Sequence, residues 1–257
     1  YLCGLMESDW KVDHVTIFDF MKMLGPSGIE EINKKILGIA KNHKLIDPME
    51  VLSDTTAQEA MIPYPNEVGL MNRYMDLVKK GIGKLGGKFQ SFKKTIKVTW
   101  KEVKGLVRNS HLFAKTVEEK RKVGKKLYHV ISEVQTEIAS LLSTGSKLTS
   151  KAGKEITRLS EVMEDLLPQM LHFLETGFVA NKKIIHLQME KLYSIVRGKA
   201  GKKVEFGLKW GINRIGGGFV QGFLMKNVAH ASDKKFCIEA VKKHIETFGH
   251  APNVYGF

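Results

Sequence analysis

Apolar residues recur at the spacing of an α-helix from residue 66 to about residue 197, over roughly half of the chain. One stripe with steps of three or four positions consists of Phe89, Phe92, Ile96, Trp100, Val103 and Val107, and similar stripes occupy 127–141 and 156–170. Helices with one apolar face bury that face against each other. The sequence therefore predicts a helical bundle in the middle of the chain.

On both sides of this stretch the pattern differs. The first 47 residues predict two helices, with Ser27 and Glu30 as a capping box for the second helix. Residues 49–55 form a short apolar run that ends in hydroxyl residues, which is typical of a strand and places Asp54 at its C-terminal end. The last part of the chain alternates with the period of two that a half-buried strand has, as at Val204, Phe206, Leu208 and Trp210.

The elements outside the bundle follow one another as strand, strand, strand, helix, strand. Gly216 to Gly218 supply a turn between the second and third strands, and the helix begins near Asp233. We therefore expect a mixed α and β fold with four parts. These are an N-terminal helical region (1–47), a strand with a proline-containing loop (48–65), a basic helical insertion (66–197) and the remaining three strands with their helix (198–257).

The positive charge is concentrated in the bundle. The chain carries 41 Lys and Arg against 27 Asp and Glu, a net charge of +14. Between residues 76 and 130 there are sixteen Lys or Arg but only four Asp or Glu, a net charge of +12. Charge so concentrated favours a polyanionic partner, either a nucleic acid or an anionic membrane surface, although a solvated helical face remains an alternative.

Other features narrow the class of protein. Two cysteines, Cys3 and Cys237, are too few for a disulfide-stabilised secreted fold, and no apolar run is long enough to span a bilayer. Gly81, Gly83 and Gly86 match the dinucleotide-binding pattern but follow a helix instead of a strand. No histidine or cysteine spacing fits a zinc site. A cytoplasmic protein is the expectation.

Asp54 is the best candidate for a functional carboxylate. Side chains at the exit of a strand are where α/β proteins place catalytic and metal-binding groups. Hard cations such as Mg²⁺ prefer carboxylate oxygens. The alternative is that Asp54, followed by Thr55 and Thr56, only forms a turn.

Two sequence blocks carry a resemblance to a known family. Residues 51–60 (VLSDTTAQEA), followed by 62–67 (IPYPNE), resemble the first catalytic block of bacterial insertion-sequence transposases of the DDE type. Residues 197–207 (RGKAGKKVEFG) are similar to the block that opens the second strand in those proteins. The helices between about Gly81 and Met189 match nothing in that family.

The resemblance implies a partial RNase H-like sheet with a large helical insertion after its first strand. In that family two Asp and one Glu hold a pair of Mg²⁺ (or Mn²⁺) ions that cut DNA, and Asp54 is the implied catalytic residue and metal ligand. The second Asp is expected just beyond Phe257 and the Glu much later. We therefore expect a chain that comes from an enzyme but is inactive by itself. Glu59, Glu67 and Glu205 are the substitutes to consider.

The expected partner is double-stranded DNA, at the element ends and at the target, in the nucleoid; a homo-oligomer is left open. The proposed DNA-binding residues are Lys93, Lys94, Lys97, Lys101, Lys104, Arg108, Lys199 and Lys202. The alternative is a non-catalytic interaction module. In that interpretation residues 84–108 lie on an anionic membrane or in a partner groove through Phe89, Phe92 and Trp100.

Overall fold

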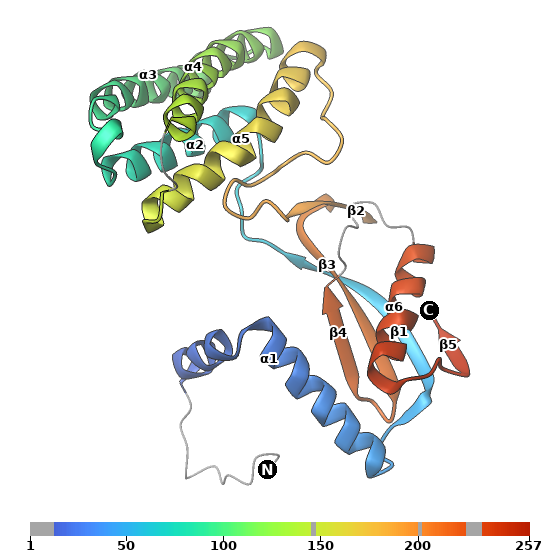
Figure 1. Cartoon of the computed structure of the whole chain (residues 1–257). Coiled ribbons are helices and arrows are strands. Elements are labelled where there is room, and N and C mark those ends of the chain that lie inside the picture. The colour runs from blue at the N-terminus through green and yellow to red at the C-terminus, as the bar shows by residue number, and fades with distance from the viewer. Residues whose placement is uncertain (1–12, 145–147, 200–201, 225–232) are drawn as a thin grey trace. The chain divides into compact units, whose positions relative to one another are not determined.

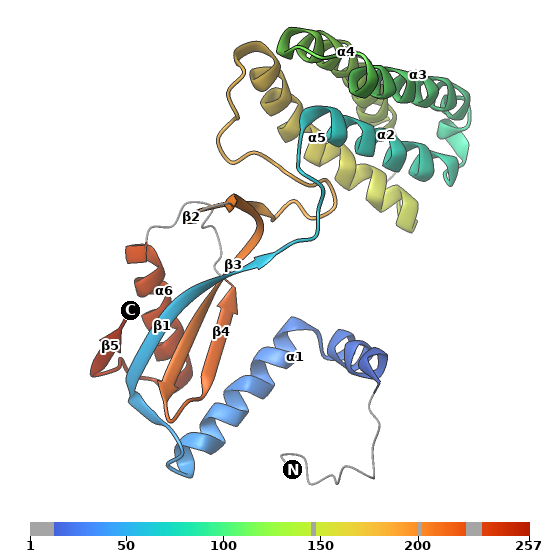
Figure 2. The ribbon, with the colours of Figure 1, turned by 180° about the vertical axis from the view of Figure 1, so that it is seen from behind.

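The structure is a computed structural model, and it describes residues 13–144, 148–199, 202–224 and 233–257 (Figures 1 and 2). The chain divides into two compact units. The first unit contains residues 1–57 and 209–257, and the second contains residues 58–208. The fold is mixed α and β, as the sequence predicts.

The N-terminal helix of the first unit is interrupted. Helix α1 (His14–Asn42) starts at Asp13, whose carboxylate accepts a hydrogen bond from Val15 N at 3.4 Å. Gly25 has φ +65°, which a helix does not tolerate, so α1 is two helices joined at this residue and matches the predicted pair. Its C-terminal end packs through Leu37 and Ala40.

Five strands form one sheet in the described part of the chain, in the order β2-β3-β1-β5, with β4 also paired to β3. They are β1 (Asp47–Glu59), β2 (Tyr193–Lys199), β3 (Lys202–Gly216), β4 (Val220–Leu224) and β5 (Val254–Gly256). β3 is antiparallel to β2 and to β4, whereas β5 runs parallel to β1. β1 and β3 are antiparallel, because Ser53 bonds to Asn213 while the later Gln58 lies against Gly207.

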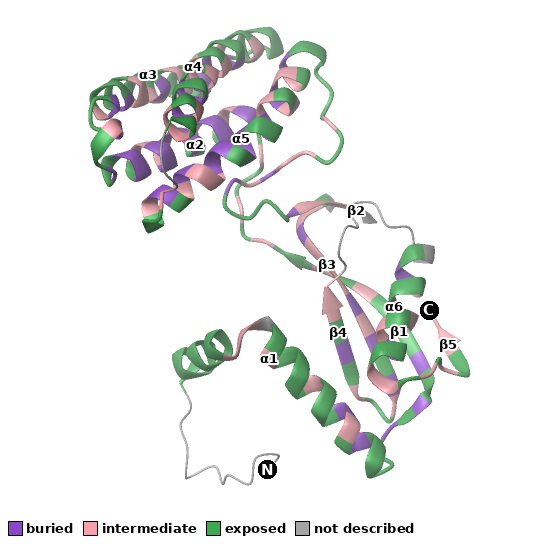
Figure 3. Ribbon diagram, in the orientation of Figure 1, coloured by how far each residue is buried: buried purple, intermediate pink, exposed green. Residues whose placement is uncertain are grey.

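One face of the sheet is covered by α6 (Asp233–Phe248) (Figure 3). Phe236 is fully buried and stacks on Phe223 of β4, with the ring centroids 6.0 Å apart. A side chain at Gly211 of β3 would collide with both rings, so this glycine allows the helix to approach the strand. Ala240, one turn after Phe236, is also fully buried. The buried line of α6 thus runs from Phe236 to His244, whereas Ile245 is 40% exposed.

His244 makes the stability of the first unit depend on pH. Burial lowers the pKa of His244, and the nearby His250 and Lys41 lower it further. The folded state therefore resists a proton that the unfolded chain accepts near pH 6.5. The stabilising contribution is complete above that pH and is lost as the pH falls below it.

We expect the free energy of unfolding to fall between pH 7.5 and pH 5, by less than about 1.4 kcal/mol per pH unit for this one proton. The replacement His244→Phe, which can stack on Phe248, flattens the curve in urea titrations followed by circular dichroism. His186 keeps a residual slope in both proteins, because burial and Arg73 lower its pKa. Equal slopes in the two proteins contradict the assignment to His244.

The second unit is built around four long helices, α2 (Glu67–Gly83), α3 (Phe92–Leu112), α4 (Val117–Ser143) and α5 (Lys151–Thr176). A short 3-10 helix, η1 (Gly87–Phe89), precedes α3. α2 contacts the other three helices, and α4 contacts both α3 and α5. The predicted apolar stripes form their common core, in which Phe89, Ile96, Leu127 and Met163 are at most 2% exposed. The helical bundle is therefore confirmed.

A polar cluster sits inside this apolar core. The Tyr74 hydroxyl donates to Gln135 Oε1 at 2.7 Å, and Gln135 Nε2 donates to Ser160 Oγ at 2.8 Å. Burial raises the pKa of Tyr74. The three residues come from α2, α4 and α5, so the cluster fixes how these helices are aligned.

Removing only the centre of this cluster is expected to be costly. Gln135→Leu leaves the Tyr74 and Ser160 hydroxyls without their partner, and each buried orphan costs about 1–3 kcal/mol. The double variant Tyr74→Phe/Gln135→Leu recovers part of the loss, because the phenol no longer needs an acceptor. Urea unfolding of the two single variants and the double variant measures the coupling, and strictly additive losses argue against a shared cluster.

The segment after α5 differs from the prediction. The sequence predicts helix to about residue 197, but the helix ends at Gly177, which caps it with φ +80°. Residues 178–192 form a connecting segment, and β2 follows because Tyr193, Ile195 and their neighbours pair with β3. The predicted helical insertion (66–197) is therefore wrong over its last twenty residues.

The connecting segment is attached to the start of the bundle. Lys183 forms an ion pair with Glu67 in the first turn of α2, and both side chains are largely buried. Arg158 donates to the backbone oxygen of Leu187 at 2.8 Å, and Arg73 donates to Gln188 Oε1 at 2.6 Å. The connecting segment after α5 is thus held next to the start of α2.

Candidate functional site

Asp54 lies on the exposed side of β1. Val51 and Ser53 of this strand are buried, whereas Leu52, Asp54 and Thr56 are exposed, because neighbouring residues of a strand point to opposite faces. Asp54 Oδ1 accepts a hydrogen bond from Thr55 N at 2.6 Å. The prediction that Asp54 ends the strand is wrong, since β1 continues to Glu59.

The neighbouring strand gives Asp54 its place in the sheet. β5 is parallel to β1, and its last residue, Gly256, is paired with Leu52. Asp54 therefore lies two residues beyond the end of β5, in the direction in which both strands run. Asp54 thus stands next to the carboxyl end of β5, whereas β1 itself continues for five more residues to Glu59.

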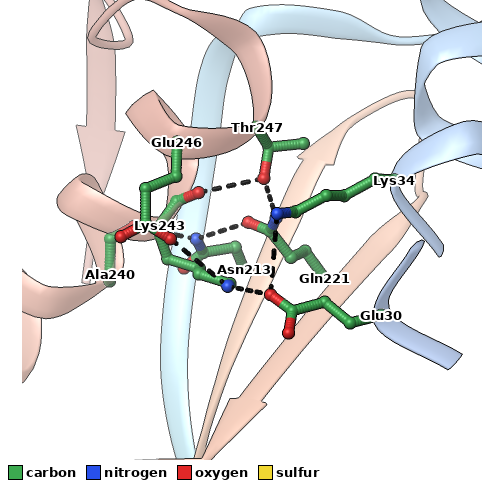
Figure 4. A network of polar contacts seen from close by, with 8 residues as sticks. All are labelled: Glu30, Lys34, Asn213, Gln221, Ala240, Lys243, Glu246 and Thr247. Carbon is green, nitrogen blue, oxygen red and sulfur yellow. Dashed lines mark hydrogen bonds and ion pairs between the residues drawn. The ribbon is translucent and has the colours of Figure 1, made fainter. Parts of the chain in front are cut away.

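A buried polar network supports β1 directly beneath this position. Figure 4 shows the part of it that joins Asn213, Gln221, Ala240 and Thr247. Ser53 Oγ donates to Asn213 Oδ1 at 2.7 Å, and Asn213 Nδ2 donates to the backbone oxygen of Ala240 at 3.0 Å and to Gln221 Oε1 at 3.3 Å. Gln221 Nε2 in turn donates to Thr247 Oγ1. Asn213 is fully buried and thus connects β1, β3, β4 and α6.

We expect Asn213→Ala to lower the free energy of unfolding, by about 1–3 kcal/mol for each partner that loses its hydrogen bond. Amide hydrogen exchange at Ser53 should accelerate in the same variant, because β1 loses its attachment to the strand beside it. The exposed Asn253 provides the matched control, and Asn253→Ala is expected to leave both measurements unchanged. A stability loss at Asn213 no larger than at Asn253 contradicts the role of the network.

An ion-pair cluster attaches α1 to α6 beside the same network (Figure 4). Lys243 of α6 pairs with Glu30 of α1 and with Glu246 at 3.3 Å, and Glu30 also lies 3.7 Å from Lys34. Burial works against the charged amine, yet the two carboxylates hold the pKa of Lys243 above its usual value. The cluster attaches the second half of α1 to α6 within the first unit.

The described carboxylates do not by themselves make a magnesium site. Across the described residues, no group of three or more His, Cys, Asp or Glu side chains is arranged to hold a metal ion. Glu67, one of the considered substitutes, is used in its buried pair with Lys183. Glu59 and Glu205 have interaction partners of their own. Asp54 alone would supply one carboxylate where two-metal chemistry needs several, and no catalytic step follows from these residues.

The basic face of α3 is the second candidate site. Lys94, Lys97, Lys101 and Arg108, here called the basic stripe, follow one another at helical spacing and are exposed. None of the four has an ion pair or a hydrogen-bonded side-chain partner among the residues the structure describes. They lie opposite the buried face with Ile96 and Val103. The basic stripe is therefore a row of uncompensated positive charge.

Two of the predicted DNA-binding residues on α3 differ from this stripe. Lys104 Nζ donates to Asn72 Oδ1 at 2.6 Å and to the Asp76 carboxylate at 2.9 Å. Burial raises the pKa of Asp76, but hydrogen bonds from Lys104 and Trp100 bring it below its ordinary value. The charge of Lys104 is thus compensated inside the unit. Lys93 is half-buried at the flank of the basic stripe.

The remaining predictions for DNA contacts fall outside the structure. Lys199 ends β2 and Lys202 begins β3, and the side chains of both lie outside the described residues.

No helix in the described part of the chain is long and apolar enough to cross a membrane. No family model matches the chain, and no curated protein or solved structure is significantly similar to it.

The network around Asn213 has no signal in the sequence. The residue sits in an alternating segment that indicates only a strand, and its partner Ser53 is 160 positions away. The sequence also gives no sign that Asp76 neutralises the charge of Lys104, although both residues belong to the basic segment 76–130. The signal that did succeed was helical spacing, which places four of the predicted cations on one face of α3.

Proposed function

We propose that the chain binds double-stranded DNA and is part of a DDE-type transposase. Metal-dependent cleavage and transfer of DNA strands belong to the complete parent protein in this proposal. The present residues supply DNA binding and one carboxylate, Asp54, of the metal site. The resemblance of residues 51–67 and 197–207 is the starting point of the proposal.

The observation that carries it is the pairing of β1 with β5. The transposase pattern expects the second Asp after the strand that follows the helix, which corresponds to β5 here. β5 is the parallel neighbour of β1, and their register continues so that a residue following Phe257 in a longer chain would stand beside Asp54. Two carboxylates at that separation are what a pair of divalent cations requires. The geometry supports an RNase H-like sheet without depending on the sequence blocks.

The basic stripe supports the DNA-binding part. Its four side chains are spread over residues 94–108 of one helix, about 21 Å, and each is free to neutralise a phosphate. Phosphate contacts of this kind position a protein on DNA without specifying a sequence. The proposal therefore concerns affinity and orientation, and not the choice of target site.

The membrane alternative is less well supported. It needs the aromatic face of residues 84–108 to be available, but Phe89 is 1% and Phe92 7% exposed in the bundle core. Trp100 donates to Asp76 Oδ1 at 2.7 Å, and Lys79 lies 3.2 Å from the centre of its ring. The apolar face of α3 is thus already occupied by the other helices.

DNA binding is tested by fluorescence anisotropy with a labelled duplex at several salt concentrations. Lys94→Gln, Lys97→Gln and Lys101→Gln are combined in one variant, and the matched control combines Lys151→Gln, Lys154→Gln and Lys191→Gln, which are exposed residues of the same unit. We expect the stripe variant to bind more weakly. Its log–log salt slope should be shallower by about 0.9 for each phosphate that the variant no longer neutralises. Equal weakening in the control variant would falsify the basic stripe as the contact surface.

The transposase assignment has a separate test in the DNA that flanks the coding segment. Inverted repeats on both sides are expected, together with codons for the second Asp directly after Phe257 and for the Glu further on, in frame or after a frameshift. A downstream sequence without these carboxylates, and flanks without repeats, count against the assignment even if the chain binds DNA.

A further inference from the structure

An exposed apolar tip stands at the C-terminal end of the basic stripe. Leu112 is 48%, Phe113 69% and Val117 73% exposed, and these three residues, the apolar tip, surround the turn between α3 and α4. Leu112 continues the line of the basic stripe, four residues after Arg108, as the helical period requires. A row of cations thus leads along α3 to a small cluster of apolar side chains.

The turn that carries this tip is ordered by its own hydrogen bonds. Thr116 and Glu119 form a capping box at the start of α4, in which Glu119 accepts from Lys115 N at 2.8 Å and from Thr116 N at 2.9 Å. Phe113 N donates to Asn109 O at 2.9 Å, and Ala114 is buried beneath the turn. The backbone that carries Phe113 is therefore fixed, and most of its side chain is exposed to solvent.

The surroundings of the tip favour an anionic partner. Lys115, Lys120 and Lys122 are exposed around it and have no ion pair within the residues that the structure describes. Of the two nearby acids, Glu118 is exposed and Glu119 is engaged in the capping box. An exposed aromatic ring among such cations has the chemistry of a side chain that stacks on nucleic-acid bases.

We propose that the apolar tip is a wedge that enters DNA at a disrupted base step while the basic stripe holds the adjoining phosphates. Apolar side chains that enter a duplex in this way must separate stacked bases, which costs less where a base is already missing or unpaired. The chain should therefore prefer a duplex with such a step over an intact one. This inference rests on the proposed DNA binding and adds a preference for one DNA structure.

An anionic membrane surface is the other partner with suitable chemistry, and the geometry favours it less. Helices that lie on membranes insert a broad apolar face along their length, whereas the inner face of α3, with Ile96 and Val103, is packed in the bundle. Only the few side chains of the tip are available. The cations also follow a line along the helix, as a phosphate backbone requires.

The test compares two labelled duplexes of equal length, one intact and one with a single abasic position, by anisotropy with the full chain. We expect about tenfold tighter binding to the abasic duplex, the size of one base–aromatic stacking interaction. Phe113→Ala should lower affinity for the abasic duplex to that for the intact one, and Phe113→Trp should retain the preference. Phe178 is exposed to a similar extent in the same unit, and Phe178→Ala is the control that should keep the preference.

A second readout reports on stacking itself. With 2-aminopurine placed next to the abasic position, binding of the full chain should change its fluorescence, and the Phe113→Ala chain should not. Thermal unfolding of each variant, followed by circular dichroism, verifies that the bundle is intact.

The outcomes separate the two proposals. Binding to both duplexes through the basic stripe with equal affinity overturns the wedge but leaves DNA binding standing. Absence of salt-sensitive binding to either duplex overturns both proposals. A third outcome favours a membrane surface and overturns the wedge. In it, Phe113→Ala abolishes binding to vesicles of phosphatidylserine and phosphatidylcholine but does not change binding to DNA.

Discussion

The arrangement of the strands and helix in the first unit depends on the side-chain amide of one residue, Asn213. Its oxygen and nitrogen bind partners on β1, β4 and α6 at once, while its own backbone lies in β3. A buried amide with every partner in place accepts only one register of the strands around it, since a shift by one residue would move Ser53 to the other face. The position of Asp54, the residue that follows Ser53, is set by this restriction.

In the second unit, the arrangement of the helices depends mainly on apolar packing. Its core is a set of interleaved apolar stripes, into which the cluster of Tyr74, Gln135 and Ser160 introduces polar groups that must match. Its surface separates compensated from uncompensated charge, as Lys104 is bound by Asp76 while the basic stripe is left to solvent. The same helix, α3, thus contributes to the core on one side and presents a row of uncompensated positive charge on the other.

The sequence was sufficient wherever structure depends on nearby residues. Helical spacing identified α3, α4 and α5, and the glycines at 216–218 identified the turn before β4, where Gly217 and Gly218 have φ of +95° and +90°. It was insufficient where pairing partners are distant in the chain. β2 was missed because Tyr193–Lys199 forms a strand only by pairing with β3, and β1 is longer than predicted because β3 also pairs with its second half.

The same distinction applies to the candidate site. Asp54 and the cations on α3 could be selected from the sequence, because a carboxylate near a strand and cations at helical spacing are visible in a short stretch of sequence. Whether Lys104 was free, and what lay beneath Asp54, depended on Asp76 and Asn213, which only the folded chain brings near.

The fastening of the bundle's two ends has a consequence for how such a protein can change over evolutionary time. The Glu67–Lys183 pair and the bonds from Arg158 and Arg73 join the incoming and outgoing chain, so the chain enters and leaves the four helices at neighbouring points. A module attached in this way can be enlarged, exchanged or deleted by recombination at those two points. The strands β1 and β3 would keep their register, so new surfaces could be acquired without rebuilding the sheet.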